Sequence, residues 1–205
     1  EGKGTFSEPF LISHINHLYW LSQENKYWNK NKVSSNQQSY FKQINDIDAI
    51  NTKFWNNGEG FTPIGIYPGF PFEGVYDGSG YMIKNMYINR SADNDIGLFS
   101  YIDNPSNISI IKNLHLEKIL YSGYTNVGGA VGSIGASAEL TNIIVSGKIT
   151  GNNNYIGGII GKIIGGTLTN SYSKVDVSGN NYVGGAVGGT VEGANAIIIN
   201  SYSNG

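Results

Sequence analysis

The sequence predicts an all-β fold built as a parallel β-helix (β-solenoid). Three glycine-rich blocks of nearly identical sequence recur at intervals of about 28 residues, as expected of stacked repeats. Between them, short stretches that alternate apolar and polar residues lie between corners rich in Gly and Asn. No apolar stripe of helical spacing fits inside a repeat, so we expect two or three strands in each. A four-stranded β-propeller blade, which needs about 40 residues, is the weaker alternative.

A glycine block and an asparagine element define the repeat. The first glycines of the three blocks are Gly128, Gly157 and Gly184. An asparagine begins a short strand-like run at five positions, which are Asn85, Asn113, Asn142, Asn170 and Asn200. Because the last run is cut off at Gly205, we expect the chain to be a monomeric piece of a longer protein.

The first 45 residues differ from the repeats and are expected to cap the stack. Ser13 is the predicted N-cap of a helix from about residue 14 to 28, in which Ile15, Leu18 and Tyr19 recur at helical spacing. The polar stretch 26–38 is predicted to be a loop, 40–48 a first rung, and 55–72 a packed loop. We therefore predict one domain, with a cap at 1–45 and a solenoid at 46–205.

Equivalent residues of a β-solenoid stack in columns about 4.8 Å apart. Two columns are apolar early and small late, and are expected to face inward: Met86, Leu114, Ile143, Ser171 and Ser201, and Ile88, Leu116, Val145, Ser173 and Ser203. The column between them is expected to face outward: Tyr87, His115, Ile144, Tyr172 and Tyr202. The asparagines themselves are expected to form an internal ladder of amide hydrogen bonds.

The glycine blocks, with the Asn-Ser-Tyr-Ser elements that follow them, resemble the GLUG repeat of bacterial surface proteins. The amino-terminal half resembles the usual lead-in of these proteins, through Gly4-Thr5, Pro9-Phe-Leu-Ile12, Tyr40-Phe41, Asn45-Asp-Ile-Asp48, Thr62-Pro-Ile-Gly65, Phe72-Glu-Gly74, Asp77-Gly-Ser-Gly80 and Ile83-Lys-Asn85. The resemblance implies a right-handed β-helix in a large exported protein, secreted or on the bacterial cell surface. Such repeats occur in adhesin-like proteins and in non-catalytic regions of IgA1-specific metallopeptidases.

The resemblance supplies neither catalytic residues nor an agreed ligand. The third position of the glycine block is often Leu in the family, and it is Ala130, Ile159 and Ala186 here. This departure is conservative and leaves the implied fold unchanged.

Composition argues against several classes of partner. Charged residues make up 14% of the chain, the net charge is −2, and Lys and Arg form no cluster that would bind nucleic acid. No stretch approaches the roughly 20 apolar residues that span a bilayer, so membrane insertion by this segment is not expected. Without cysteine, neither a disulfide framework nor a thiolate metal site is possible.

No set of residues forms a recognisable catalytic or metal site. His14 and His17 lack the glutamate and the spacing of a zinc protease helix, and His115 falls in the outward column. The acids of the early repeats are candidates for a glycosidase pair, which needs carboxyls about 5 to 9.5 Å apart: Asp46, Asp48, Asp77, Asp93, Asp95 and Asp103. The first three are expected to cap turns, and Asp93-Asn-Asp95 to form a solvated turn rather than a calcium site. We therefore expect no enzyme activity, cofactor or metal.

The outward column is the candidate binding site, through Tyr87, His115, Tyr172 and Tyr202. Exposed aromatic rows stack on sugar rings or anchor proteins, so a host or matrix glycan or protein is the expected partner. Alternatively, the tyrosines stabilise the stack laterally, and Ile144 interrupts their row. The function expected is adhesion or a rigid stalk. The alternatives are a substrate-presenting region of a secreted IgA1-type metallopeptidase and, more weakly, a polysaccharide-active enzyme.

Overall fold

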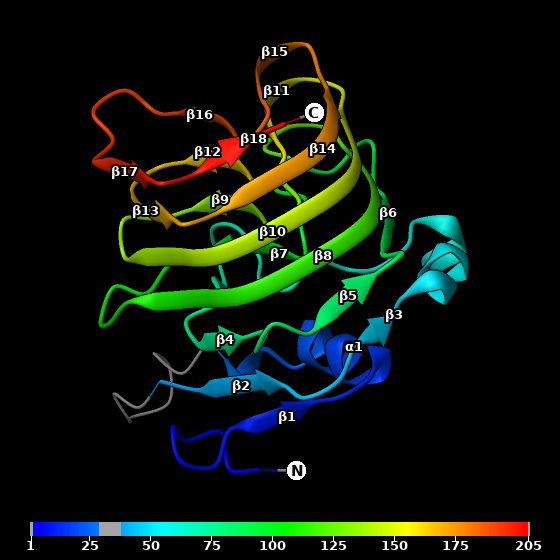
Figure 1. Cartoon of the computed structure of the whole chain (residues 1–205), viewed down its shortest axis with the longest axis vertical. Coiled ribbons are helices and arrows are strands. Elements are labelled where there is room, and N and C mark those ends of the chain that lie inside the picture. The colour runs from blue at the N-terminus through cyan, green and yellow to red at the C-terminus, as the bar shows by residue number, and fades with distance from the viewer. Residues whose placement is uncertain (1, 29–37, 205) are drawn as a thin grey trace.

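The computed structural model describes residues 2–28 and 38–204, and strands dominate it (Figure 1). In this part of the chain every pairing between two named strands is parallel, which confirms the predicted all-β class with stacked parallel strands. The two longest strands, β8 (Ser109–Gly123) and β10 (Ala138–Gly151), run side by side across the middle of the molecule.

The largest sheet has two rows of strands separated by a corner. The first row is β1 (Phe10–Ile12), β2 (Tyr40–Gln43), β4 (Val75–Asp77), the start of β8, the start of β10, β13 (Gly166–Thr169) and β17 (Ala196–Ile199). The second row is β3 (Ile47–Asp48), β5 (Met82–Lys84), the middle of β8, the middle of β10, β14 (Tyr172–Ser178) and β18 (Tyr202–Ser203). The end of β8 also pairs with β6 (Tyr87–Asn89).

Two further sheets complete each passage of the chain. One contains β7 (Phe99–Ile102), β9 (Val131–Ile134), β12 (Ile160–Ile163) and β16 (Val187–Thr190), and the other contains β11 (Asn154–Gly157) and β15 (Asn181–Gly184). From β10 the chain passes through β11 and β12 and returns as β13, where Leu168 pairs with Leu140 at the start of β10. We call one such passage of the chain a coil, and the strands that one coil contributes to the stack a rung.

One continuous apolar core fills the interior. Leu114, Ile143 and Val145 are completely buried, and Ser171 and Ser173 take the same inward positions on the following rung. The alternation of the strands therefore places these columns inward from Leu114 and Leu116 onward, as predicted. Met86 and Ile88 are also buried, but their place in the columns was wrong, because Ile88 pairs with Tyr121 and Ile83 pairs with Leu116. Ser203, on the last described strand, is exposed.

The amino-terminal helix is shorter than predicted. The helix α1 spans Ile15–Gln23, and a separate 3₁₀ helix η1 (Asn25–Tyr27) follows the break at Glu24, whose φ and ψ of −110° and 67° are not helical. The predicted cap was also wrong, because His14 occupies the N-cap position without a side-chain hydrogen bond. The backbone N–H of Ser13 instead donates to Nδ1 of His17.

Helix α1 contributes Leu18 and Leu21 to the core. The predicted loop at 26–38 lies largely outside the described residues. The predicted packed loop at 55–72 follows the 3₁₀ helix η2 (Ile50–Phe54) and contains the 3₁₀ helix η3 (Asn56–Gly58). Its Phe61, Ile64 and Phe72 are completely buried, so the segment covers the early rungs as expected.

Candidate binding face

Four of the five predicted outward residues form one column. The strand register pairs His115 with Ile144, Ile144 with Tyr172, and Tyr172 with Tyr202. The rings of Tyr172 and Tyr202 have centroids 4.8 Å apart and are tilted by 40°. Ile144 between the aromatic residues is 42% exposed, so the column presents an apolar strip to solvent. We call His115, Ile144, Tyr172 and Tyr202 the outer column.

Tyr87 does not belong to the outer column, which corrects the sequence prediction. Strand β6 pairs with the end of β8, so Tyr87 lies beside Leu120, whereas Met82 of β5 lies beside His115. The pairing of Lys84 with Glu117 places Asn85 at the next corner of the coil, not at the corner of Asn113. The interval between the two asparagines matches the repeat length without marking equivalent positions. Tyr87 instead lines a separate groove of about 470 Å³ beside η2.

The repeated asparagines make the corner between the two rows of the large sheet. Asn113, Asn142, Asn170 and Asn200 have φ angles of 52°, 55°, 49° and 48°. Among non-glycine residues, Asn tolerates this left-handed conformation best, because its short polar side chain bonds locally. The repeated residue is therefore selected by backbone geometry, and its amide is left at the surface.

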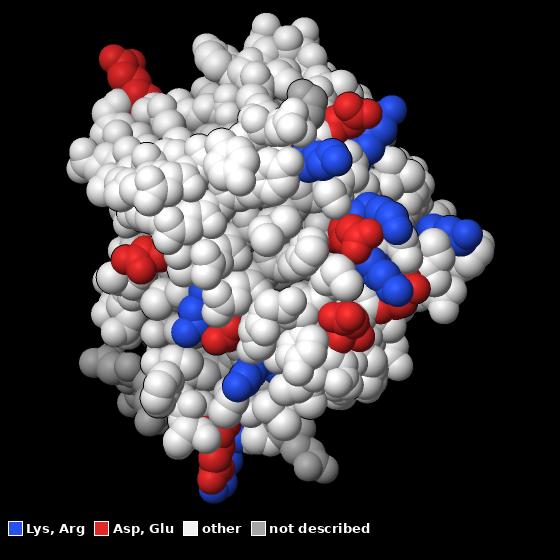
Figure 2. Space-filling view, viewed as in Figure 1, with Lys and Arg blue, Asp and Glu red and all other residues white. Residues whose placement is uncertain are grey.

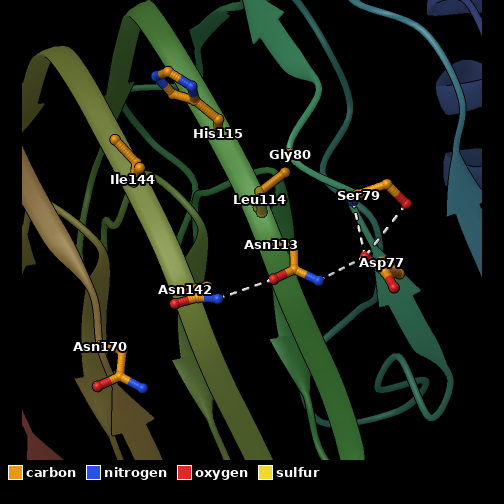
Figure 3. Close-up of a pocket in the computed structure, with 9 residues that line it drawn as sticks. All are labelled: Asp77, Ser79, Gly80, Asn113, Leu114, His115, Asn142, Ile144 and Asn170. Atoms are coloured by element: carbon orange, nitrogen blue, oxygen red, sulfur yellow. Dashed lines mark hydrogen bonds between the residues drawn. The ribbon is translucent and has the colours of Figure 1, made fainter.

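These amides form an external ladder that is interrupted once. Nδ2 of Asn113 donates to Oδ1 of Asp77 at 3.0 Å, and Nδ2 of Asn142 donates to Oδ1 of Asn113 at 3.1 Å (Figure 3). Nδ2 of Asn200 donates to Oδ1 of Asn170 at 3.3 Å. The predicted ladder was placed inside the solenoid, which is wrong, because Asn142, Asn170 and Asn200 are exposed.

A groove of about 410 Å³ lies between the ladder and the outer column. One side of the groove is formed by Asp77, Asn113, Asn142 and Asn170. The other side is formed by His115 of β8 and Ile144 of β10 (Figure 3). Burial alone would raise the pKa of the Asp77 carboxyl. The hydrogen bonds from Asn113 and the Ser79 backbone, with the nearby Lys112 ammonium, hold that pKa below its usual value. Asp77 is therefore a charged end to the ladder.

The other early acids mostly serve the backbone. Asp46 accepts from the N–H of Met82, Asp48 from that of Ile50, and Asp103 from that of Ser137. The turn-capping role predicted for Asp48 and Asp77 is thus confirmed, because each accepts from the backbone N–H two residues later. Asp46 instead links its rung to the next one, so the predicted turn cap at Asp46 was wrong. In residues 2–28 and 38–204, no three His, Cys, Asp or Glu side chains lie where they could share a metal ion. His14 and His17 stack with ring centroids 3.8 Å apart.

The predicted solvated turn at Asp93-Asn-Asp95 was half wrong. Asp93 is exposed and pairs with Arg90, but Asp95 is only 7% exposed. Asp95 accepts from Nδ2 of Asn126 at 2.9 Å and from the hydroxyl of Ser133. Its pKa is raised by burial, against the lowering effect of those two hydrogen bonds and of Lys162. Its neighbours in the sequence gave no sign that it is buried.

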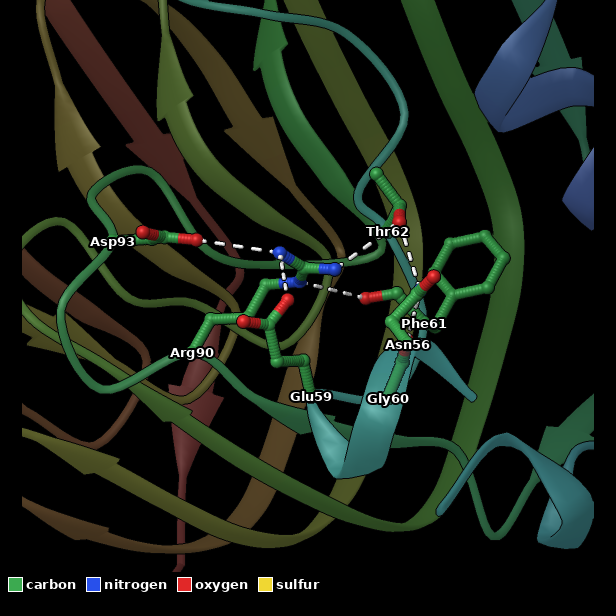
Figure 4. Close-up of polar contacts among 7 residues, drawn as sticks. All are labelled: Asn56, Glu59, Gly60, Phe61, Thr62, Arg90 and Asp93. Carbon is green, nitrogen blue, oxygen red and sulfur yellow. Dashed lines mark hydrogen bonds and ion pairs between the residues drawn. The ribbon is translucent and has the colours of Figure 1, made fainter. Parts of the chain in front are cut away.

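Arg90 fastens the packed loop to the stack (Figure 4). Its guanidinium forms ion pairs with Glu59 at 3.0 Å and Asp93 at 3.4 Å, and it donates to the Phe61 carbonyl and the Thr62 hydroxyl. The side chain is only 14% exposed. Each of its three guanidinium nitrogens has a partner within the fold, so we interpret this cluster as a structural fastening.

A second tyrosine column was missed by the sequence analysis. Tyr155 and Tyr182 stack with centroids 4.8 Å apart and ring planes only 8° from parallel. Both have left-handed φ angles, as do Asn126 and Asp95 below them in the same column. Nζ of Lys162 lies 5.2 Å from the Tyr155 ring. The sequence signal for this column is the Tyr that opens two of the three glycine blocks.

The glycine blocks form a column through which the coils approach each other closely. Gly157 pairs with Gly184, and the adjacent Val127 and Ile156 bridge the preceding rung. A Cβ added at Gly157 would lie 2.1 Å from the Ile160 carbonyl oxygen and 2.5 Å from the Gly188 nitrogen. A side chain at this position would therefore collide with two backbone segments.

Charge is mixed over the face of the molecule that carries β8, β10 and β14. Lys and Arg are interspersed with Asp and Glu there, and no area of that face has a single sign (Figure 2). The field over this face is therefore too weak to attract a strongly charged ligand from a distance. In the described part of the chain, no helix is both long and apolar enough to cross a membrane.

Stacked parallel coils with polar corners and an open groove define the molecule as a β-repeat protein that presents an extended surface. The comparisons with known proteins agree with this class. Residues 152–178 match the GLUG motif, so the chain carries the repeat that its sequence resembles. The strands on either side of this segment pair in parallel with it.

Two relatives and one solved structure are also similar to this chain. Halomucin of Haloquadratum walsbyi is 34% identical over 168 residues, covering 79% of this chain and 2% of halomucin. A putative Gly-rich membrane protein of Evansella cellulosilytica is 32% identical over 135 residues, covering 66% of this chain and 13% of that protein. The chain thus spans a small part of each. The crystal structure of a putative immunoglobulin A1 protease from Bacteroides ovatus has a similar fold, with a TM-score of 0.65, 20% identity, and coverage of 100% of this chain and 69% of that one.

Proposed function

We propose that this chain is a non-catalytic segment of a large cell-surface or secreted protein, and that it binds a host or matrix glycan or protein through the outer column. The coils then form a right-handed β-helix, the hand that parallel crossover connections almost always take. The GLUG motif and the two relatives, one named as a mucin and one as a membrane protein, support a surface location.

One observation carries the binding role, namely the exposed aromatic and apolar strip beside a groove. Tyr202 is 65% exposed and Ile144 is 42% exposed, and Ile144 lines the groove together with Asn142 and Asn170. Rows of exposed aromatic rings stack on the apolar faces of sugars and anchor protein partners. A column used only for lateral stability would not require the neighbouring groove.

The test is a glycan and matrix-protein binding array with the purified chain. Tyr172→Ala removes the central ring of the outer column, and Tyr155→Ala removes a stacked tyrosine from a different sheet. Binding that is lost in Tyr172→Ala and kept in Tyr155→Ala supports the proposal. Equal loss in both variants, or no binding to any arrayed molecule, contradicts an adhesive role and favours a rigid stalk.

A second candidate is a substrate-presenting region of a secreted peptidase. The observation in its favour is that the fold of the putative immunoglobulin A1 protease covers the whole of this chain. The test is whether the full-length protein contains a His-Glu-x-x-His zinc motif and whether deleting this segment slows cleavage of immunoglobulin A1. A full-length protein without that motif would rule this candidate out.

A further inference from the structure

The amide ladder breaks between Asn142 and Asn170, inside the groove. The register of β10 against β13 and β14 places these two residues on adjacent rungs at the same corner. Every other step of the ladder has an amide nitrogen donating to the residue one rung earlier. Across this step, among the residues that the structure describes, neither Oδ1 of Asn142 nor Nδ2 of Asn170 has a hydrogen-bond partner, and Figure 3 shows the two amides unconnected.

The break leaves one acceptor and one donor facing the same opening. Oδ1 of Asn142 can only accept a hydrogen bond, and Nδ2 of Asn170 can only donate one. A group that both donates and accepts a hydrogen bond is needed to connect the two amides, and a hydroxyl is the simplest such group. Oδ1 of Asn142 and Nδ2 of Asn170 are not hydrogen-bonded to each other (Figure 3). A hydroxyl oxygen about 2.8 Å from each of these atoms would accept from one and donate to the other.

The rest of the groove has the character of a sugar subsite. Ile144 lies beside the amides and offers an apolar contact for C–H groups, and Tyr172 follows it in the outer column. The carboxylate of Asp77 lies at the far end and is already bound to Asn113, Ser79 and Lys112. No unpaired positive charge lines the groove among the described residues, so nothing there favours an anionic ligand.

We propose that this groove binds a neutral glycan, with one sugar hydroxyl bridging Asn142 and Asn170 and the apolar face of the same sugar ring lying on Ile144 and Tyr172. This inference rests on the proposed binding function and specifies its ligand class and polar contacts. Asn113 and Asn200 hold the other amide atoms of Asn142 and Asn170 through hydrogen bonds, without contacting the bridging hydroxyl.

The test uses glycine rather than alanine at the corner. Asn142→Gly and Asn170→Gly remove the amides, and glycine adopts the left-handed φ of these positions without strain. Asn85→Gly is the matched control, because Asn85 has a φ of 59° at another corner and its amide donates to Asp48. Binding of the arrayed neutral glycans, and of their monodeoxy analogues, is measured by calorimetry for the three variants and the unmodified chain.

We expect each of the two groove variants to bind about three- to ten-fold more weakly, as for loss of one neutral hydrogen bond. Asn85→Gly should bind normally, and one monodeoxy sugar should lose as much affinity as the variants. Binding that is lost in Tyr172→Ala but unchanged in both groove variants would overturn this inference and leave the binding function intact. Binding only of sialylated or sulfated glycans, or only of proteins, would likewise overturn the neutral-glycan assignment.

Discussion

The amide nitrogen of Asn142 lies 3.1 Å from the amide oxygen of Asn113 one rung earlier, and both residues hold a left-handed backbone. One residue type thus performs two tasks at each corner. Its backbone makes the turn between two strands, and its side chain is hydrogen-bonded to the corner of a neighbouring rung. A corner that used glycine would turn equally well but would leave the rungs unlinked at the surface.

The dual role predicts an order of stability at Asn113. Asn113→Ala and Asn113→Gly both lose the hydrogen bonds to Asp77 and Asn142. The free energy of unfolding of the alanine variant should be lower than that of the glycine variant by about 1 to 2 kcal/mol, because only alanine carries the cost of a left-handed backbone. Urea unfolding followed by circular dichroism measures both. An alanine variant as stable as the glycine variant would show that backbone strain does not select the asparagine.

Because the Asp95 carboxyl is buried, we expect a neutral side chain at this position to raise the free energy of unfolding. Its pKa is raised from 3.8, so the folded chain holds the proton more tightly than the unfolded chain does. That contribution to stability is complete below about pH 4 and is lost as the pH rises through the folded pKa. Asp95→Asn keeps an oxygen to accept from Asn126 and Ser133, and should be more stable than the unmodified chain near neutral pH.

The two proteins should converge when unfolding is repeated at about pH 4, where Asp95 is increasingly protonated. Greater stability of the unmodified chain near neutral pH would show instead that the carboxylate charge, through Lys162, contributes to the fold.

The glycine column predicts a severe effect of one methyl group. Gly157→Ala places a Cβ against the Ile160 carbonyl and the Gly188 nitrogen, both of them backbone atoms with little room to move. We expect a loss of about 3 kcal/mol in the free energy of unfolding, as for strong overpacking. Gly69→Ala is the control, since an added Cβ there would meet nothing within 4 Å. Equal melting temperatures for the two variants would contradict the close approach of the coils.

The sequence predicted the inward columns because alternation along a strand is a local property. Val145 and Ser173 lie two residues from Ile143 and Ser171, and the pleat brings each pair to one face. The parallel stacking followed in the same way from the repeat interval. The outer column was correct from His115 onward, because one register connects His115, Ile144, Tyr172 and Tyr202, and the shift between β8 and β10 comes after it, between Val145 and Gly147.

The errors arose where a corner had to be identified without its partner strand. Asn85 has the residue type and backbone of the Asn113 corner but lies at a different one, and only the pairing of Lys84 with Glu117 reveals this. Tyr155 and Tyr182 have left-handed φ angles that their residue type does not indicate. Such a conformation is imposed by the surrounding coils, so propensity alone could not identify it.

The stacked tyrosines predict a measurable coupling. The rings of Tyr155 and Tyr182 lie nearly parallel on successive rungs, and stacked aromatic pairs are worth about 0.5–1.5 kcal/mol beyond their buried area. A double-mutant cycle with Tyr155→Ala, Tyr182→Ala and the double variant should give a coupling of about 1 kcal/mol in urea unfolding. Additive effects of the two substitutions would mean that the stacking contributes nothing to stability.

The Arg90 cluster predicts local rather than global loosening. A lysine at this position keeps the charge but cannot reach Glu59, Asp93 and the Phe61 carbonyl together, because it lacks the planar fork of donors. In Arg90→Lys the segment 55–72, which contains aromatic residues but no Lys or Arg, should be cleaved faster by chymotrypsin and exchange its amide hydrogens faster, with the later coils unchanged. Lys148→Ala, an exposed cation on β10, is the control. Faster exchange throughout the chain would show that Arg90 supports the whole stack, whereas unchanged protection of 55–72 would show that the buried phenylalanines alone hold the loop.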